Sequence, residues 1–242
     1  MIIKRVIISK SQLYTIPEAE RTLMILIGHW KNETNILHKL LIFCQTEVDS
    51  DIVRKAHTSQ ALLIARVYIG KLFEGWRMLE KTFFASKLSQ EYEVLLSSNG
   101  KSALKNLKQY FGKKNLIEEI RNNYSFHYTP EEVTEQLKLF DVNSEFEDFL
   151  SKDSANSLSF LSEEVISRAM LKRIDADNDF IAMNKFMDEL LKVSKWVTEF
   201  CGHCIVAILG KYFIPADFKT EDILISNSPK ITGVSIPYFV ER

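Results

Sequence analysis

The residues of this chain that could carry out acid–base chemistry on a phosphate lie in the segment 116–128. Arg121 is followed at once by Asn122, and His127 comes six positions after the arginine. A histidine with a pKa near neutrality can accept and return a proton, and a guanidinium is a permanent, forked donor that matches phosphate oxygens. Six residues turn an ideal helix by about 240°, so the Arg121 and His127 side chains flank the Tyr124 face. They converge only if the arginine uses its length or the helix loosens.

These residues resemble the signature of the HEPN superfamily, in which an arginine, a polar residue and then a histidine lie late in a helix of a bundle. The family motif is R-x(4–6)-H, and here five residues separate Arg121 from His127. The resemblance implies metal-independent endoribonuclease activity without a cofactor, in a toxin or defence context. His127 would act as general base on a ribose 2′-hydroxyl, Arg121 would stabilise charge on the phosphate, and Asn122 would orient either group. The resemblance also implies a homodimer that builds each site from both chains.

Two alternatives stay open. The chain can be a HEPN-like bundle that binds RNA, a nucleotide or a protein partner without catalysis. Arg121 can instead pair with Glu118 or a neighbouring helix, with His127 capping a helix end. In the toxin branch of the family an antitoxin partner modifies a tyrosine two residues after the histidine, but Thr129 holds that place here and Tyr128 is adjacent. An antitoxin protein therefore stays open as a partner, while the threonine at this place argues against the modification mechanism of that branch.

Basic side chains gather just before the motif. Residues 101–121 contain six lysines or arginines and two glutamates. The residues expected to contact single-stranded RNA are Lys101, Lys105, Lys108, Lys114 and Tyr128. The first three lie at helical spacing on one face, and such a stripe can follow a phosphate backbone. The alternative is an ordinary solvated helix face.

Composition excludes several classes of protein. The formal net charge of −1 argues against a strongly basic protein that coats nucleic acid. Three cysteines do not suggest a disulfide framework, and this favours a reducing cytoplasm. We expect no membrane segment, because the apolar run 204–209 is far shorter than the ~20 residues of a membrane span.

No metal site is expected. Cys201 and Cys204 are spaced like half of a zinc site, but zinc needs four ligands and the sequence has no second pair of this kind. Cys204 falls on the apolar stripe of a long helix, where cysteine behaves as a small hydrophobic residue.

The elements that must position the motif are helices. Apolar residues recur at steps of three and four over about 17–44, 52–83 and 179–213. Three long helices with this spacing predict an all-α fold, an up-down bundle with several shorter helices. The shorter helices are expected at 89–97, 101–111, 114–128, 130–140 and 162–173.

Three regions follow from this pattern. Residues 1–16 are expected to form an extended lead-in, and 17–213 a HEPN-like helical bundle domain. After Pro215 the sequence becomes rich in β-branched residues separated by Asn, Ser, Pro and Gly. Residues 214–242 are therefore expected to form an irregular or strand-like C-terminal tail packed on the bundle.

Overall fold

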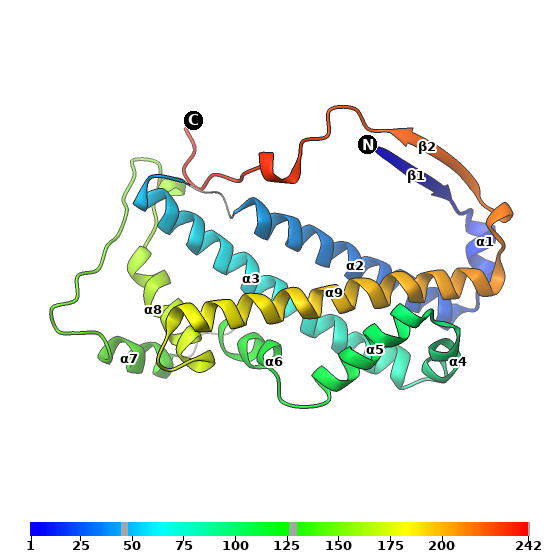
Figure 1. The fold of residues 1–242 in the computed structure, drawn as a ribbon, viewed down its shortest axis with the longest axis horizontal. Helices are drawn as coiled ribbons and strands as arrows, with labels where there is room; N and C mark the ends of the chain where they lie inside the picture. The colour runs from blue at the N-terminus through cyan, green and yellow to red at the C-terminus, as the bar shows by residue number, and fades with distance from the viewer. Residues whose placement is uncertain (45–47, 126–129, 242) are drawn as a thin grey trace.

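The computed structural model describes residues 1–44, 48–125 and 130–241, which form an elongated helical bundle with a two-stranded ribbon beside it (Figure 1). Within this part the helices are α1 (Lys10–Thr15), α2 (Glu18–Phe43), α3 (Asp51–Leu79), α4 (Leu88–Leu95), α5 (Ser98–Phe111), α6 (Leu116–Ile120), α7 (Pro130–Lys138), α8 (Phe160–Ile174) and α9 (Asp179–Tyr212). The strands are β1 (Ile2–Ile7) and β2 (Lys219–Leu224). Two π-helices, Glu80–Phe84 and Arg121–Ser125, continue α3 and α6.

The three long helices match the predicted apolar stripes closely, and the all-α prediction is confirmed. α2 runs antiparallel to α3, and α9 spans the length of the bundle antiparallel to α2 (Figure 1). α9 packs against both α2 and α5, while α3 packs against α6 and the π-helix that follows it. The N-termini of α3 and α9 are fixed by side-chain caps, since Ser50 accepts from Val53 N and Asn178 accepts from Phe180 N and Ile181 N.

One contact between α2 and α3 depends on an aromatic ring that packs on a glycine. The Trp30 indole N–H donates to the carbonyl of Lys71 at 2.9 Å, which places the ring directly against α3. A Cβ atom at Gly75 would overlap that ring. The side chain of Trp30 is only 3% exposed, so the glycine is what allows a large apolar group to fill this interface.

A buried carboxylate joins α2 to α4 and α9. Glu20 is 5% exposed and accepts hydrogen bonds from Tyr92 and, at 2.9 Å, from Tyr212, while Lys211 Nζ lies 3.0 Å from it. Burial by itself would raise the pKa of Glu20, but the three donors outweigh burial and leave the pKa below its ordinary value. Glu20 is therefore a satisfied buried anion that holds three helices together.

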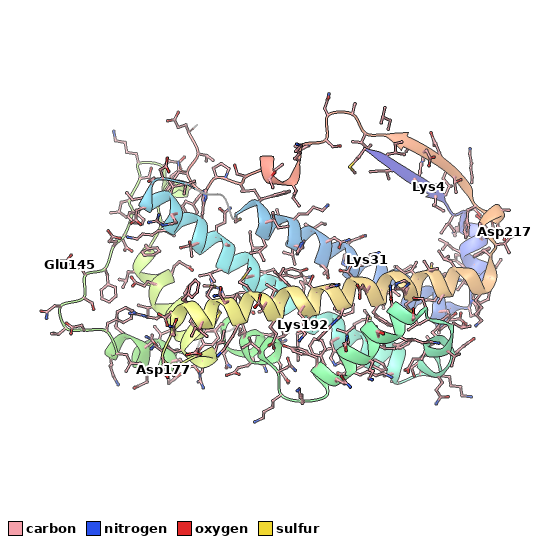
Figure 2. The ribbon with its side chains drawn as sticks, viewed as in Figure 1. Lys4, Lys31, Glu145, Asp177, Lys192 and Asp217 are labelled. Atoms are coloured by element: carbon pink, nitrogen blue, oxygen red, sulfur yellow. The ribbon has the colours of Figure 1, made fainter. Side chains whose placement is uncertain are left out.

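The N-terminal strand pairs with a strand from the C-terminal region to form a ribbon. β1 pairs antiparallel with β2, in a register that places Ile2 opposite Leu224 and Ile7 opposite Lys219. Most ribbon side chains are exposed. In Figure 2, Lys4 projects from β1, while Asp217 lies near the bend that leads into β2.

The rest of the tail and the lead-in differ in detail from a simple extended chain. Beyond β2 the tail returns to the bundle, where Ile236 N donates to the Phe43 carbonyl at 3.1 Å.

Residues 10–15, expected to be extended, form α1. The reason is a capping box at its start, in which Ser9 and Gln12 each accept from the other's backbone N–H.

No helix in the described ranges is both long enough and apolar enough to cross a membrane.

Gly75→Ala is expected to lower the free energy of unfolding by about 3 kcal/mol, because the new methyl group must displace the Trp30 ring. The matched control is Gly210→Ala in α9, where a Cβ meets nothing within 4 Å and stability should stay the same or rise by up to about 1 kcal/mol. Urea denaturation of both variants measures the difference. Equal stabilities would contradict the packing argument.

Glu20→Gln is expected to lower stability at pH 7 by about 1–3 kcal/mol, because it removes charge-assisted hydrogen bonds. The folded-state pKa of Glu20 lies below its ordinary value of 4.5, so this stabilisation is present above pH 4.5 and is lost as pH falls through the folded pKa. The wild type should thus progressively lose its advantage over the variant as the pH is lowered from 7 through 4.5 and below. Denaturation curves across this range test it, and a constant difference would contradict it.

Candidate functional site

The motif segment begins as an ordinary helix and then widens. Asn115 caps α6 by accepting from Glu118 N at 2.9 Å, and Ile117 and Ile120 are buried against the bundle. From Arg121 to Ser125 the chain is π-helical. The predicted single helix over 114–128 is therefore interrupted at the arginine.

The π-helix changes the geometry that the sequence implied. A π-turn bonds i to i+5, so its residues are spaced more closely in angle than in an α-helix, and such turns are frequent at functional sites. The 240° separation expected between Arg121 and His127 does not apply across it. His127 and Tyr128 lie outside the described residues, so their positions relative to Arg121 stay predictions.

The Arg121 guanidinium lies at the surface between α3 and its own segment. Its Nε and Nη2 atoms donate to Glu74 Oε1 at 3.1 and 2.6 Å, and its Nη1 atom donates to Asn122 Oδ1 at 3.0 Å. The guanidinium carbon is 5.3 Å from the centre of the Phe73 ring. This is the ion pair with a neighbouring helix that the sequence left open, and its partner is on α3 rather than Glu118.

The exposure of this ion pair decides how strongly Glu74 competes with another anion for the Arg121 guanidinium. The Arg121 side chain is 27% exposed and the Glu74 side chain is 50% exposed. Exposed ion pairs contribute about 0–1 kcal/mol. A phosphate that contacts the guanidinium in a bidentate way can therefore replace Glu74 at small cost, while Asn122 still holds Nη1.

Tyr124 fixes the buried side of the same segment. Its hydroxyl donates to Glu132 and, at 3.2 Å, to the Ala169 carbonyl, and Glu132 also accepts from Arg173. Burial and then the bond to Glu132 raise the pKa of Tyr124, so it remains a neutral donor. The π-helix is thus anchored to α7 and α8 behind the surface that Arg121 presents.

A cavity of about 300 Å³ borders Tyr124 between α7 and α8. Its lining includes Glu131, Glu132 and Glu135 as well as Lys172 and Arg173. Three carboxylates against two cations give no net attraction for a phosphate backbone. This cavity therefore does not extend the predicted RNA surface.

One buried charge near the motif was not identified from the sequence. Arg66 on α3 is 8% exposed, its Nη2 lies 3.4 Å from Glu163, and its carbonyl accepts from Ser125 Oγ at 2.8 Å. The sequence feature that could have identified it is an arginine at a position within the apolar stripe of the second long helix. Glu74 gave no comparable signal, because it lies 47 positions from its partner Arg121.

The predicted basic residues of α5 lie together. Lys101, Lys105 and Lys108 line one groove of about 260 Å³ with Glu93 and Gln109. Lys108 Nζ is 2.6 Å from Glu93 and 5.3 Å from the centre of the Phe84 ring, so part of its charge is neutralised.

The groove is connected to the motif by a short basic loop. Lys101 and Lys105 have no ion pair among the described residues. Lys114 is exposed in the loop that joins α5 to α6, and these two helices follow one another along the same side of the bundle (Figure 1). The structure therefore places the predicted basic residues on consecutive elements that lead to Arg121.

The two closely spaced cysteines lie inside the bundle as free thiols. Cys201 and Cys204 are fully buried on α9, and burial raises the pKa of Cys204 to about 12. Within the described ranges, no group of three or more His, Cys, Asp or Glu side chains is placed to hold a metal ion.

Comparisons with models of protein families, with curated proteins and with solved structures give no match to this chain.

Proposed function

We propose that the chain is a HEPN-type endoribonuclease that cleaves single-stranded RNA without a metal ion, acts as a homodimer and serves in a toxin or defence context. The observation that carries the proposal is the partial exposure of the Arg121 guanidinium. Its guanidinium is partly exposed at the first turn of a π-helix, beside Asn122 and at the end of a basic loop.

The proposed chemistry divides the work between two side chains. His127 removes the proton from a ribose 2′-hydroxyl, and the 2′-oxygen attacks the adjacent phosphate. As the P–O2′ bond forms, the P–O5′ bond breaks, which leaves a 2′,3′-cyclic phosphate and a 5′-oxygen that takes a proton from solvent. Arg121 stabilises the negative charge that builds on the phosphate oxygens. Glu74 acts as a positioning residue, because it holds the guanidinium until a phosphate takes its place.

The lysines of α5 and the α5–α6 loop supply the electrostatic path to this site. Lys101, Lys105 and Lys114 are exposed, and each can contact a phosphate of a single strand. The proposed dimer brings a second copy of the motif to the site, and an antitoxin would block the same surface.

The alternative is a non-catalytic HEPN-like bundle that binds RNA, a nucleotide or a protein partner. One observation favours it, namely that Glu74 and Asn122 already engage the Arg121 guanidinium. The two functions differ in whether RNA is cut.

The cleavage test uses purified full-length chain with varied single-stranded RNAs in EDTA. Wild type should cut, while His127→Ala and Arg121→Ala should each reduce the rate by about 10²-fold or more. The controls are His29→Ala and Arg77→Ala, which remove the same residue types from surface positions outside the motif. Circular dichroism and sedimentation report fold and dimer. A folded, dimeric wild type that leaves every RNA intact overturns the enzyme proposal and favours the binding function.

RNA binding is tested in the His127→Ala background so that the probe survives. Glu74→Gln should tighten binding by about two- to fivefold, because it removes the carboxylate that competes with phosphate. The matched control is Glu221→Gln, which breaks a similarly exposed pair with Arg5 on the ribbon.

In the same assay, replacing Lys101 and Lys105 together by alanine should reduce the slope of log affinity against log salt by about 1.4, since each phosphate contact on a single strand contributes about 0.7. Replacing Lys4 and Lys219 on the ribbon should leave the slope unchanged. Equal slopes for both pairs would show that RNA does not follow α5.

A further inference from the structure

A second cavity lies where the C-terminal end of α2 meets the start of α3 and the start of α9. It has a volume of about 260 Å³ and shares no described lining residue with the Arg121 site. Four of its nine described lining residues carry a nitrogen or sulfur atom that binds soft metal ions. They are Cys44, His57, Met183 and Met187.

The histidine is the polar group that needs an explanation. His57 is 6% exposed, and neither of its ring nitrogens has a hydrogen-bond partner in the described structure. Buried polar atoms in folded proteins are nearly always paired. A neutral imidazole nitrogen is also a common metal ligand, so a bound cation would satisfy it.

The sulfur atoms come from separate helices. Cys44, at the end of α2, is 2% exposed, and Met183 and Met187 lie four residues apart and so share one face of α9. The whole chain has only three cysteines and six methionines, so composition does not account for three of them at one cavity. The remaining lining is mostly aliphatic and, among described residues, contains no carboxylate.

We propose that this cavity is a Cu(I) site, with Cys44 Sγ, a ring nitrogen of His57 and a thioether of Met183 or Met187 as ligands. Soft sulfur ligands select Cu(I), whereas Mg²⁺ and Ca²⁺ require oxygen ligands. A monovalent ion bound by one thiolate is neutral and suits an apolar cavity. A divalent ion would carry a second positive charge that no carboxylate among the described lining residues balances.

Binding couples to one proton. The thiol of Cys44 gives up its proton to solvent as the Cu–S bond forms, and neither copper nor sulfur changes oxidation state. Burial raises the pKa of the Cys44 thiol, so the ion must displace a proton that is held at neutral pH. Arg54 also lines the cavity but is paired with Asp51, which limits its repulsion of a cation.

The test is anaerobic competition for Cu(I) between the full-length chain and a chromogenic Cu(I) chelator. Wild type should take up one equivalent and release one proton. Met183→Leu/Met187→Leu should weaken binding at least tenfold yet keep the melting temperature of the metal-free protein, because leucine nearly conserves the volume of methionine. Cys44→Ala should abolish stoichiometric binding.

Two control variants locate the ligands. Met24→Leu/Met170→Leu makes the same exchange at buried methionines away from this cavity and should leave binding unchanged. Cys201→Ala/Cys204→Ala removes the other two thiols and should also leave it unchanged. Undiminished binding by Met183→Leu/Met187→Leu, or loss of binding in Cys201→Ala/Cys204→Ala, overturns the proposal. Failure of the wild type to compete for Cu(I) does so as well. RNA cleavage enters none of these readouts.

Discussion

The contact of Trp30 with Gly75 sets how α2 and α3 pack together, and α9, α6 and α8 pack on these two helices. It brings α2 and α3 close together, and the indole bond to the Lys71 carbonyl fixes how α3 is rotated about its axis. With Gly75 turned toward α2, its neighbour Glu74 lies on the side that faces the motif segment, where it meets Arg121. A packing requirement in the core therefore determines which carboxylate the surface arginine meets.

In either proposed function, a phosphate of the ligand must compete with the Glu74 carboxylate for the Arg121 guanidinium. In the free protein Glu74 occupies two of the guanidinium donors, and Asn122 occupies a third. The pair is too exposed to contribute more than about 1 kcal/mol, so it orients the guanidinium without sequestering it. The π-helix also matters for the site, because its residues are separated by smaller angles around the helix axis than those of an α-helix.

Two buried polar side chains of this protein, Glu20 and His57, differ in whether they have hydrogen-bond partners. Glu20 is surrounded by donors from α4 and α9, and its charge is stabilised although it is buried. His57 is equally buried and has no partner in the described structure. The charge of Glu20 is therefore balanced within the bundle, whereas the cavity that His57 lines also has sulfur atoms from two other helices, and the proposed ion would bind one of its ring nitrogens.

The helices could be predicted from the order of residues alone, because burial of one face imposes a three-to-four spacing that is visible without coordinates. The stripe through Leu23, Ile27 and Trp30 is buried as expected, and α9 ends within a residue of its predicted boundary. The capping pair of Ser9 and Gln12 is a local signal for α1 that lies outside the apolar stripes. The change to a π-helix at Arg121 and the ion pair of this arginine with Glu74 emerge only when the helices are packed in three dimensions. Contacts between residues 47 positions apart depend on how helices rotate against one another, and no local periodicity records that rotation.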